Sequence, residues 1–162
     1  MNFSDEFAYK GPAVKKKAAG RGKTTETNLE KEFKKLKEES IYFDFERIPD
    51  AFSSRGGLAT PRTGDFILFY RGQTIIVEAK ETKNLKALPA SNFSTDSRAR
   101  LRRRARAGIR CLVVVYQPIL NVYRLMTIGD FDERSAGSFD LDSHPALSLQ
   151  ELIKDLLLCS QS

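Results

Sequence analysis

The chain has 162 residues, of which 41% are hydrophobic and 30% charged, and this balance suits one compact domain with a buried core. Two cysteines and a single histidine argue against a disulfide framework or a zinc site. No apolar run approaches the roughly 20 residues of a membrane span, and the N-terminus lacks a signal-peptide core, so we expect a cytoplasmic protein.

Residues 1–23 are rich in Lys, Gly and Ala, which predicts a basic, flexible N-terminal arm. We expect residues 24–162 to form a single domain. A first helix is predicted over residues 25–40, because apolar side chains recur there at helical spacing. These are Leu29, Phe33 and Leu36.

Three strands are predicted after this helix, over residues 41–48, 65–70 and 74–81. Residues 52–58 are expected to form a flexible loop between the first two strands. A turn at residues 71–73 would fold the second strand back onto the third, as a β-hairpin.

Asp65 begins this hairpin, and Glu78 and Lys80 lie near its end. Strand side chains alternate, so Glu78 and Lys80 should project from one face while Ala79 points to the other, with Asp65 brought beside them by the turn. Two converging carboxylates favour a hard cation such as Mg²⁺, with the Ala79 carbonyl as a further ligand and Mn²⁺ as a substitute. The cation activates a water, and the lysine orients it or stabilises charge on a phosphate. The alternative is an ordinary ion pair on a solvated face.

Residues 98–110 hold seven arginines and no acid, so they carry +7 while the rest of the chain sums to −1. We predict a helix that ends near Gly108, with Ala99, Leu101 and Ala105 on a narrow inward stripe. A polyanion would relieve the repulsion between arginines, which favours nucleic acid over a solvated face or a membrane surface. The arginines expected to bind it are Arg98, Arg102, Arg103, Arg104 and Arg106.

Residues 109–116 form a continuous apolar run, as expected of a strand covered on both faces, and residues 122–128 should pair with it. Ser148 and Glu151 match a capping box that opens a short C-terminal helix. The order of elements predicts an α/β fold. His144, as the only histidine, argues against histidine-based nuclease folds, since it cannot be both ligand and base.

Asp65, Glu78 and Lys80 together resemble the motif of the PD-(D/E)xK nuclease superfamily, with Gly64 in the place of its proline. This resemblance implies a restriction-endonuclease-like core, a central mixed β-sheet flanked by helices. The chain is also similar to the RecU family of Holliday-junction resolvases, although Ser97 stands where that family is expected to carry a glutamine. The similar segments are residues 21–26, 70–72, 78–84, 88–89 and 92–93.

The family resemblance implies a Mg²⁺-dependent homodimer that binds branched DNA and resolves four-way junctions by paired symmetric hydrolysis of phosphodiesters. The segment before Asp65 is short for the stalk that the family inserts into the junction. The apolar residues of the first and last helices are candidates for the dimer interface.

The first helix of such nucleases often supplies a further acid to the catalytic and metal site, and Glu26 holds that place here. Glu30 competes for the role, but Thr27 and Glu30 match a capping box, which favours Glu26. Further phosphate contacts are expected from Arg21 and Lys23. Thr82 and Lys83 either touch the same backbone or are polar residues of an exposed loop.

Three alternatives to a junction resolvase stay open. The first is a restriction-type nuclease, or a flap or fork nuclease, on the same fold. The second is a non-catalytic DNA-binding protein that uses only the arginine helix. The third is a regulatory or interaction protein whose three motif residues are surface charge.

Overall fold

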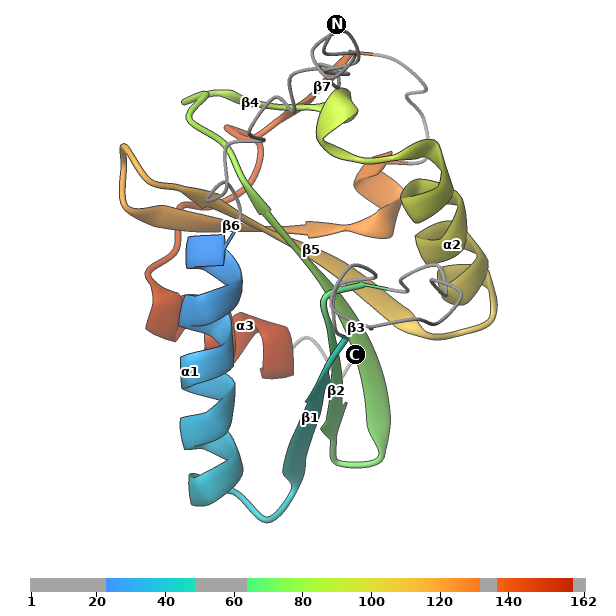
Figure 1. The fold of residues 1–162 in the computed structure, drawn as a ribbon, viewed down its shortest axis with the longest axis vertical. Coiled ribbons are helices and arrows are strands. Elements are labelled where there is room, and N and C mark those ends of the chain that lie inside the picture. Colours follow the sequence, from blue (N-terminus) through green and yellow to red (C-terminus); the bar gives the residue numbers. More distant parts are fainter. Residues whose placement is uncertain (1–22, 49–63, 132–136, 159–162) are drawn as a thin grey trace, which may run out of the picture.

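The computed structural model describes residues 23–48, 64–131 and 137–158, and the statements below concern these residues (Figure 1). The helices in this part of the chain are α1 (Lys23–Glu39), α2 (Thr95–Arg106) and α3 (Leu149–Leu158). The main sheet consists of β1 (Phe43–Arg47), β2 (Phe66–Tyr70), β3 (Gln73–Glu81), β5 (Arg110–Gln117) and β6 (Val122–Thr127). A separate antiparallel pair consists of β4 (Ala87–Pro89) and β7 (Ser138–Asp140).

The main sheet has the order β1-β2-β3-β5-β6, and all its neighbouring strands are antiparallel except β3 and β5. The β2–β3 hairpin turns at Arg71 and Gly72, whose φ angles of 48° and 78° are typical of a two-residue type I′ turn. The parallel pair needs a crossover, which runs through β4, the 3₁₀ helix η1 (Ala90–Asn92) and α2. Strand β3 therefore lies at the centre of the sheet, with two strands on each side.

One face of the sheet is covered by α1 and α3. The buried ring of Phe33 on α1 packs edge-on against Phe66 of β2, with the ring centroids 5.3 Å apart. Leu152 and Leu156 of α3 belong to the same buried cluster. Each such side chain stabilises the fold by roughly 1.5–3 kcal/mol when it leaves water.

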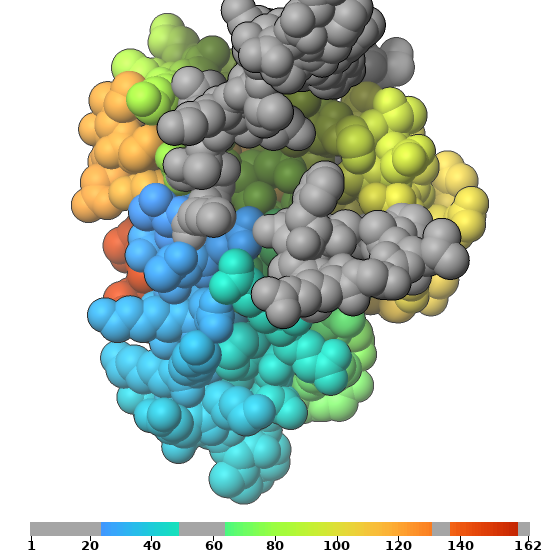
Figure 2. All heavy atoms as spheres, in the orientation of Figure 1, coloured from blue at the N-terminus to red at the C-terminus, as the bar shows by residue number. Residues whose placement is uncertain are grey.

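The opposite face carries α2 and the β4–β7 pair, and Figure 1 shows α1 and α2 on opposite sides of the sheet. Leu101 of α2 packs on Ile76 of β3 and Cys111 of β5. Phe93 and Phe139 belong to another buried cluster on this face. In the space-filling view, α2 lies at the surface on the side of the molecule away from α1 (Figure 2).

Several local predictions are confirmed. The Ser148 N–H donates to Glu151 Oε2 at 2.7 Å, and the Glu151 N–H donates to Ser148 Oγ at 3.3 Å, which is the predicted capping box. Gly108, with φ 85°, follows the last turn of α2, and the Ile109 N–H donates to the Arg104 carbonyl in a Schellman motif. The long apolar run is β5, which is buried from Cys111 to Val115 and pairs with β6.

Two local predictions are wrong. Helix α1 begins at Lys23, so Thr27 lies inside the helix and forms no capping box with Glu30. Ala99 is exposed, because residues two apart on a helix are separated by about 200° and Leu101 and Ala105 face the sheet instead. The apolar faces of α1 and α3 pack largely against the chain's own sheet, with Leu158 of α3 exposed, and the dimer interface on these helices stays a prediction.

Some predictions concern residues outside the described ranges. The described residues do not include most of the basic arm or the loop at residues 52–58 with the segment that would form a stalk. They also do not include Cys159. The β4–β7 pair was not predicted, because its two strands have three residues each and lie about fifty residues apart in the chain. Within the described ranges, no helix is long and apolar enough to span a membrane.

Candidate active site

Asp65 lies immediately before β2 and is held against β3 by backbone and side-chain hydrogen bonds. Its N–H donates to the Val77 carbonyl at 2.9 Å, and its Oδ2 accepts from the Ala79 N–H at 2.7 Å. The residue is only 6% exposed. The hairpin thus brings Asp65 beside the end of β3, as predicted.

Gly64 makes this placement possible. Its φ of 144° lies in a region open essentially to glycine, and a Cβ atom there would come within 2.7 Å of Ile76 Cγ2. A proline, whose φ is fixed near about −65°, could not adopt this backbone. The glycine in the motif is therefore a requirement of the local packing.

Glu78 and Lys80 project from β3 toward the α2 side of the sheet, whereas Ala79 points into the core beneath α1. Lys80 Nζ lies 2.6 Å from Glu78 Oε1, and the side chains are 21% and 8% exposed, respectively. The predicted alternation is confirmed. The two residues do form an ion pair, but a largely buried one, which differs from the solvated pair of the alternative interpretation.

The electrostatics of the site indicate excess negative charge. Burial and, second to it, the nearby charge of Glu78 raise the pKa of Asp65 from 3.8 to about 7. The Ala79 N–H and Lys80 act in the opposite direction, and the charge of Glu26 adds to the increase. Three carboxylates therefore act on one small region that contains one lysine.

Glu26 and Glu30 project from α1 and share one cation, Arg47 of β1. Arg47 Nη2 lies 2.7 Å from Glu26 Oε2, and its Nη1 binds Glu30. Glu30 is also 2.8 Å from Lys34, whose hydrogen bond lowers the pKa of Glu30. The charge of Glu26 is among those that raise the pKa of Asp65, and the choice of Glu26 as the helix carboxylate stays a prediction.

Arg47 was missed by the sequence analysis. A signal was present, because Phe43, Phe45 and Arg47 alternate along one strand and share a face. Both phenylalanines pack on Phe33 of α1, with ring centroids 6.0 and 5.6 Å apart. The alternation therefore predicts that Arg47 faces the first helix, where the two glutamates lie.

The residues at this site fit a divalent cation. Mg²⁺ is commonly held by one or two carboxylates and several waters, and here the mutual repulsion of Asp65 and Glu78 would be relieved by it. The amide and carbonyl of a strand residue face the same neighbouring strand, so the Ala79 carbonyl lies on the Asp65 side. No group of three His, Cys, Asp or Glu residues in the described ranges is placed to hold a metal, so water would complete the ligands.

The arginine helix α2 covers the same face of the sheet from which Glu78 and Lys80 project. Its packing residue Leu101 contacts Ile76, which lies two positions before Glu78 on β3. Ser94 caps the helix by accepting the Ser97 N–H at 3.0 Å. The arginines divide into an exposed set, Arg103, Arg104 and Arg106, and a half-buried set, Arg98, Arg100, Arg102 and Arg110.

The remaining predicted phosphate contacts are scattered. Lys83 is exposed in the connection between β3 and β4. Thr82 is buried and donates its N–H to the Tyr116 carbonyl at 3.0 Å, so its predicted contact with phosphate is wrong. Lys23 is the first residue of α1, and Arg21 lies outside the described residues.

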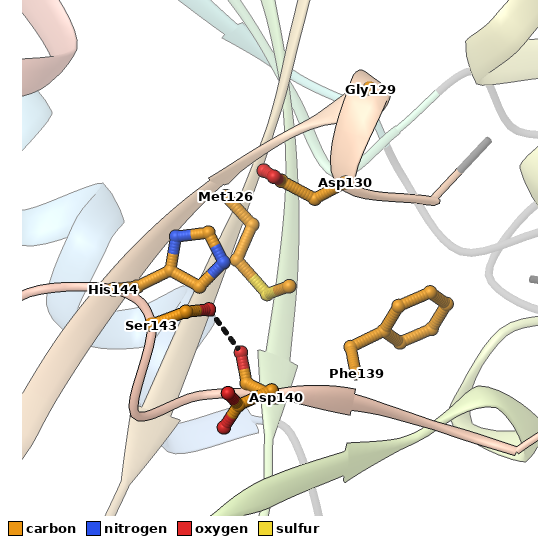
Figure 3. A pocket seen from close by; sticks show the side chains of 7 residues that line it. All are labelled: Met126, Gly129, Asp130, Phe139, Asp140, Ser143 and His144. Carbon is orange, nitrogen blue, oxygen red and sulfur yellow. Dashed lines mark hydrogen bonds between the residues drawn. The ribbon is translucent and has the colours of Figure 1, made fainter. Parts of the chain in front are cut away.

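A pocket of about 320 Å³ lies apart from these residues, next to β7 (Figure 3). Its lining contains the only histidine, His144, but not Asp65, Glu78 or Lys80. Ser143 Oγ donates to the Asp140 carbonyl at 3.0 Å across one wall. The histidine therefore lines a different part of the molecule from the paired carboxylates. The residues that line the pocket are Met126, Gly129, Asp130, Phe139, Asp140, Ser143 and His144.

No protein-family model matches this sequence, and no curated protein matches it. Among solved structures, the chain is similar to Hjc of Archaeoglobus fulgidus, a Holliday junction resolvase from an archaeal hyperthermophile, with a TM-score of 0.53 and 21% sequence identity. The match covers 81% of this chain and 98% of that one. At this identity the likeness shows the fold alone, and the RecU resemblance rests on sequence segments only. The chain has the predicted restriction-endonuclease-like fold, a mixed five-stranded sheet flanked by helices.

Proposed function

We propose that this protein is a Mg²⁺-dependent endonuclease that resolves four-way DNA junctions as a homodimer. The observation that carries the proposal is the buried cluster of Asp65, Glu78 and Lys80, because burial raises the pKa of Asp65 to about 7 beside a second carboxylate. Strongly perturbed carboxylates next to a lysine are typical of catalytic sites. The fold supports the choice of nuclease chemistry, since the similar Hjc structure is that of a junction resolvase.

In this proposal Asp65 and Glu78 would hold Mg²⁺, with the Ala79 carbonyl as a further ligand, and Glu26 would act on the site through its charge, since its carboxylate is paired with Arg47. The bound cation supplies a more acidic water and neutralises charge on the phosphate. Lys80 orients the attacking water and donates to the phosphate as negative charge develops. In-line displacement leaves a 5′-phosphate and a 3′-hydroxyl.

Arg47 has a positioning role in the same scheme. It binds both Glu26 and Glu30, so it holds the first turns of α1 against β1. Without Arg47, the carboxylates of Glu26 and Glu30 would lose the cation that they share.

The DNA-binding surface is proposed to be α2. Its arginines lie on the sheet face of Glu78 and Lys80, so a phosphate backbone on this helix passes close to the site. Paired symmetric nicks require two sites related by a twofold axis, which is why the proposal includes a homodimer. The apolar side chains of α1 and α3 pack largely on the chain's own sheet, which leaves few of them for this interface.

The test is cleavage of a labelled four-way junction with and without Mg²⁺, beside linear duplex, flap and single-stranded DNA. We expect paired nicks in the junction only, and loss of at least about a hundredfold in rate for Glu78→Ala and Lys80→Ala with junction binding retained. Lys86→Ala is the matched control, because Lys86 is an exposed lysine outside the site.

Each other result selects a different function. Equal cutting of all branched and linear substrates would keep the metal chemistry but replace the resolvase with a restriction-type or flap nuclease. Tight binding without cutting in Mg²⁺ or Mn²⁺ would leave a DNA-binding protein that uses α2. Wild-type cleavage by Lys80→Ala would show that the site is wrongly assigned.

A further inference from the structure

The side chain of Lys80 has a second contact besides Glu78. Its ammonium lies over the ring of Phe93, 5.1 Å from the ring centroid. A cation within about 6 Å of an aromatic centroid is attracted by the negative face of the ring, and the attraction grows as water is excluded. Phe93 is only 5% exposed and Lys80 is largely buried, so this contact is poorly screened by solvent.

The ring of Phe93 is held in place from several directions. Its N–H donates to the Ala90 carbonyl at 3.1 Å, which closes the short η1 turn. Phe139 packs edge-on against it, with the centroids 6.0 Å apart and the planes at 88°. Phe93 also directly precedes Ser94, the cap of α2, so the ring is tied to the arginine helix. A ring held this way can fix the position of a flexible lysine chain.

Glu78 alone is a poor anchor for Lys80. Their ion pair at 2.6 Å draws the ammonium toward a carboxylate that is also a proposed Mg²⁺ ligand. A carboxylate committed to a divalent cation attracts the ammonium less strongly. The aromatic face of Phe93 is not a proposed Mg²⁺ ligand, so its attraction for the Lys80 ammonium persists when Glu78 binds the cation.

We propose that Phe93 is a positioning residue that holds the Lys80 ammonium over its ring and so sets the orientation of the catalytic lysine. This inference rests on the proposed function. Phe93 touches neither substrate nor metal and acts through Lys80, so its removal should lower kcat while junction affinity is unchanged.

The sharpest perturbation changes the charge on the ring face without changing its shape. Phe93 is replaced site-specifically by mono-, di- and trifluorinated phenylalanine, each of which weakens the negative face while the packing stays nearly constant. We expect a stepwise fall in kcat across the series, reaching about 2- to 30-fold, with unchanged junction Kd. The matched control is the same series at Phe33, a buried ring on the opposite face of the sheet, where kcat should stay constant.

A second readout needs no activity. Protons on Lys80 Cε should be shifted upfield by the ring current of Phe93 in the NMR spectrum of the protein without DNA, and Phe93→Leu should move them back. Phe93→Tyr, which keeps the ring, should preserve both the shift and kcat.

The two measurements separate failure of this inference from failure of the proposed function. A flat kcat series in an enzyme that cuts junctions, or the absence of any ring-current shift at Lys80, would overturn the role of Phe93 alone. A normal ring-current shift in a protein that cuts no DNA would overturn the proposed function, and the positioning role with it. A stepwise series that parallels loss of stability at both Phe93 and Phe33 would also refute the inference.

Discussion

Replacing Asp65 with asparagine tests whether the site stores unfavourable electrostatic energy. The substitution removes one negative charge but keeps an oxygen able to accept the Ala79 N–H. In the folded protein burial and Glu78 raise the pKa of Asp65 from 3.8 to about 7. The stability linked to this carboxyl is therefore complete below about pH 4 and is lost as the pH rises through about 7, because the folded state must then give up its proton.

The size of the effect follows from this pKa difference. A tenfold change in proton affinity corresponds to about 1.4 kcal/mol, so a charged Asp65 costs the folded state at most about 4 kcal/mol above pH 7. Real sites relax and admit water, which lowers such penalties. We expect Asp65→Asn to be more stable than the wild type by about 2 kcal/mol at pH 8 without Mg²⁺ and equally stable near pH 4.

Urea denaturation across this pH range, in the presence of a chelator, measures the difference. A second series with Mg²⁺ should stabilise the wild type, since a ligand that binds only the folded state adds to its stability, and should stabilise Asp65→Asn less. The variant should also lose DNA cleavage. Asp142→Asn, at an exposed aspartate, is the control, and its stability should not diverge from that of the wild type as the pH rises.

Two results would refute the reasoning. One is an Asp65→Asn variant that is less stable than the wild type at pH 8 without Mg²⁺. The other is a stability gap that stays constant between pH 4 and pH 8. Either would mean that the carboxylate is not strained by burial and by Glu78, and the main support for a cation at this site would be gone.

Three further substitutions test other parts of the molecule. Gly64→Ala should lower the free energy of unfolding by about 2–4 kcal/mol in urea and slow cleavage, because the added Cβ meets Ile76 Cγ2 at 2.7 Å and φ is 144°. Gln117→Leu should cost about 2–4 kcal/mol, because buried Gln117 bonds the Asn84 carbonyl and accepts from Arg124 Nε, each at 3.0 Å. Replacing three exposed arginines by alanine should weaken junction binding and reduce the slope of log affinity against log salt by about 0.9 per lost phosphate contact, measured by fluorescence anisotropy. These are Arg103, Arg104 and Arg106.

Each of these has a clear contrary result. Full stability in Gly64→Ala would mean that the backbone at this position relaxes freely. Wild-type unfolding of Gln117→Leu would show that the buried network does not hold the β3–β4 connection. An unchanged salt slope after removal of the exposed arginines would move the DNA-binding surface away from α2.

The features that could be predicted from the sequence are those that depend on residues close together in the chain. The turn at Arg71 and Gly72, the capping box at Ser148 and the C-terminal glycine of α2 depend on neighbours a few residues apart, so the sequence was enough for them. The pairing of Glu78 with Lys80 has the same origin, since residues two apart on a strand share a face. The thirteen-residue separation of Asp65 and Glu78 needed only one hairpin to bring them together.

Where a local pattern gave a wrong prediction, contacts between segments distant in the chain determined the structure. The Thr27 and Glu30 pattern matches a capping box, but α1 starts earlier, and Glu30 binds Arg47 from a strand seventeen residues away. The stripe through Ala99 assumed a wider buried face than α2 has, because Leu101 and Ala105 cover the space above β3 and β5 without it. The periodicity of the sequence does not predict how wide that space is.

The sequence by itself determined the α/β class, the succession of the main strands along the chain and the presence of two carboxylates and a lysine on one hairpin, because alternation and turn chemistry act over short stretches. Only the tertiary structure decided that Arg47 meets Glu26 and that Phe93 lies against Lys80. It also decided how strongly the pKa of Asp65 is raised. The physical reason is that burial and long-range contacts depend on the packing of the whole sheet and its helices, and no local pattern encodes the distance between segments far apart in the chain.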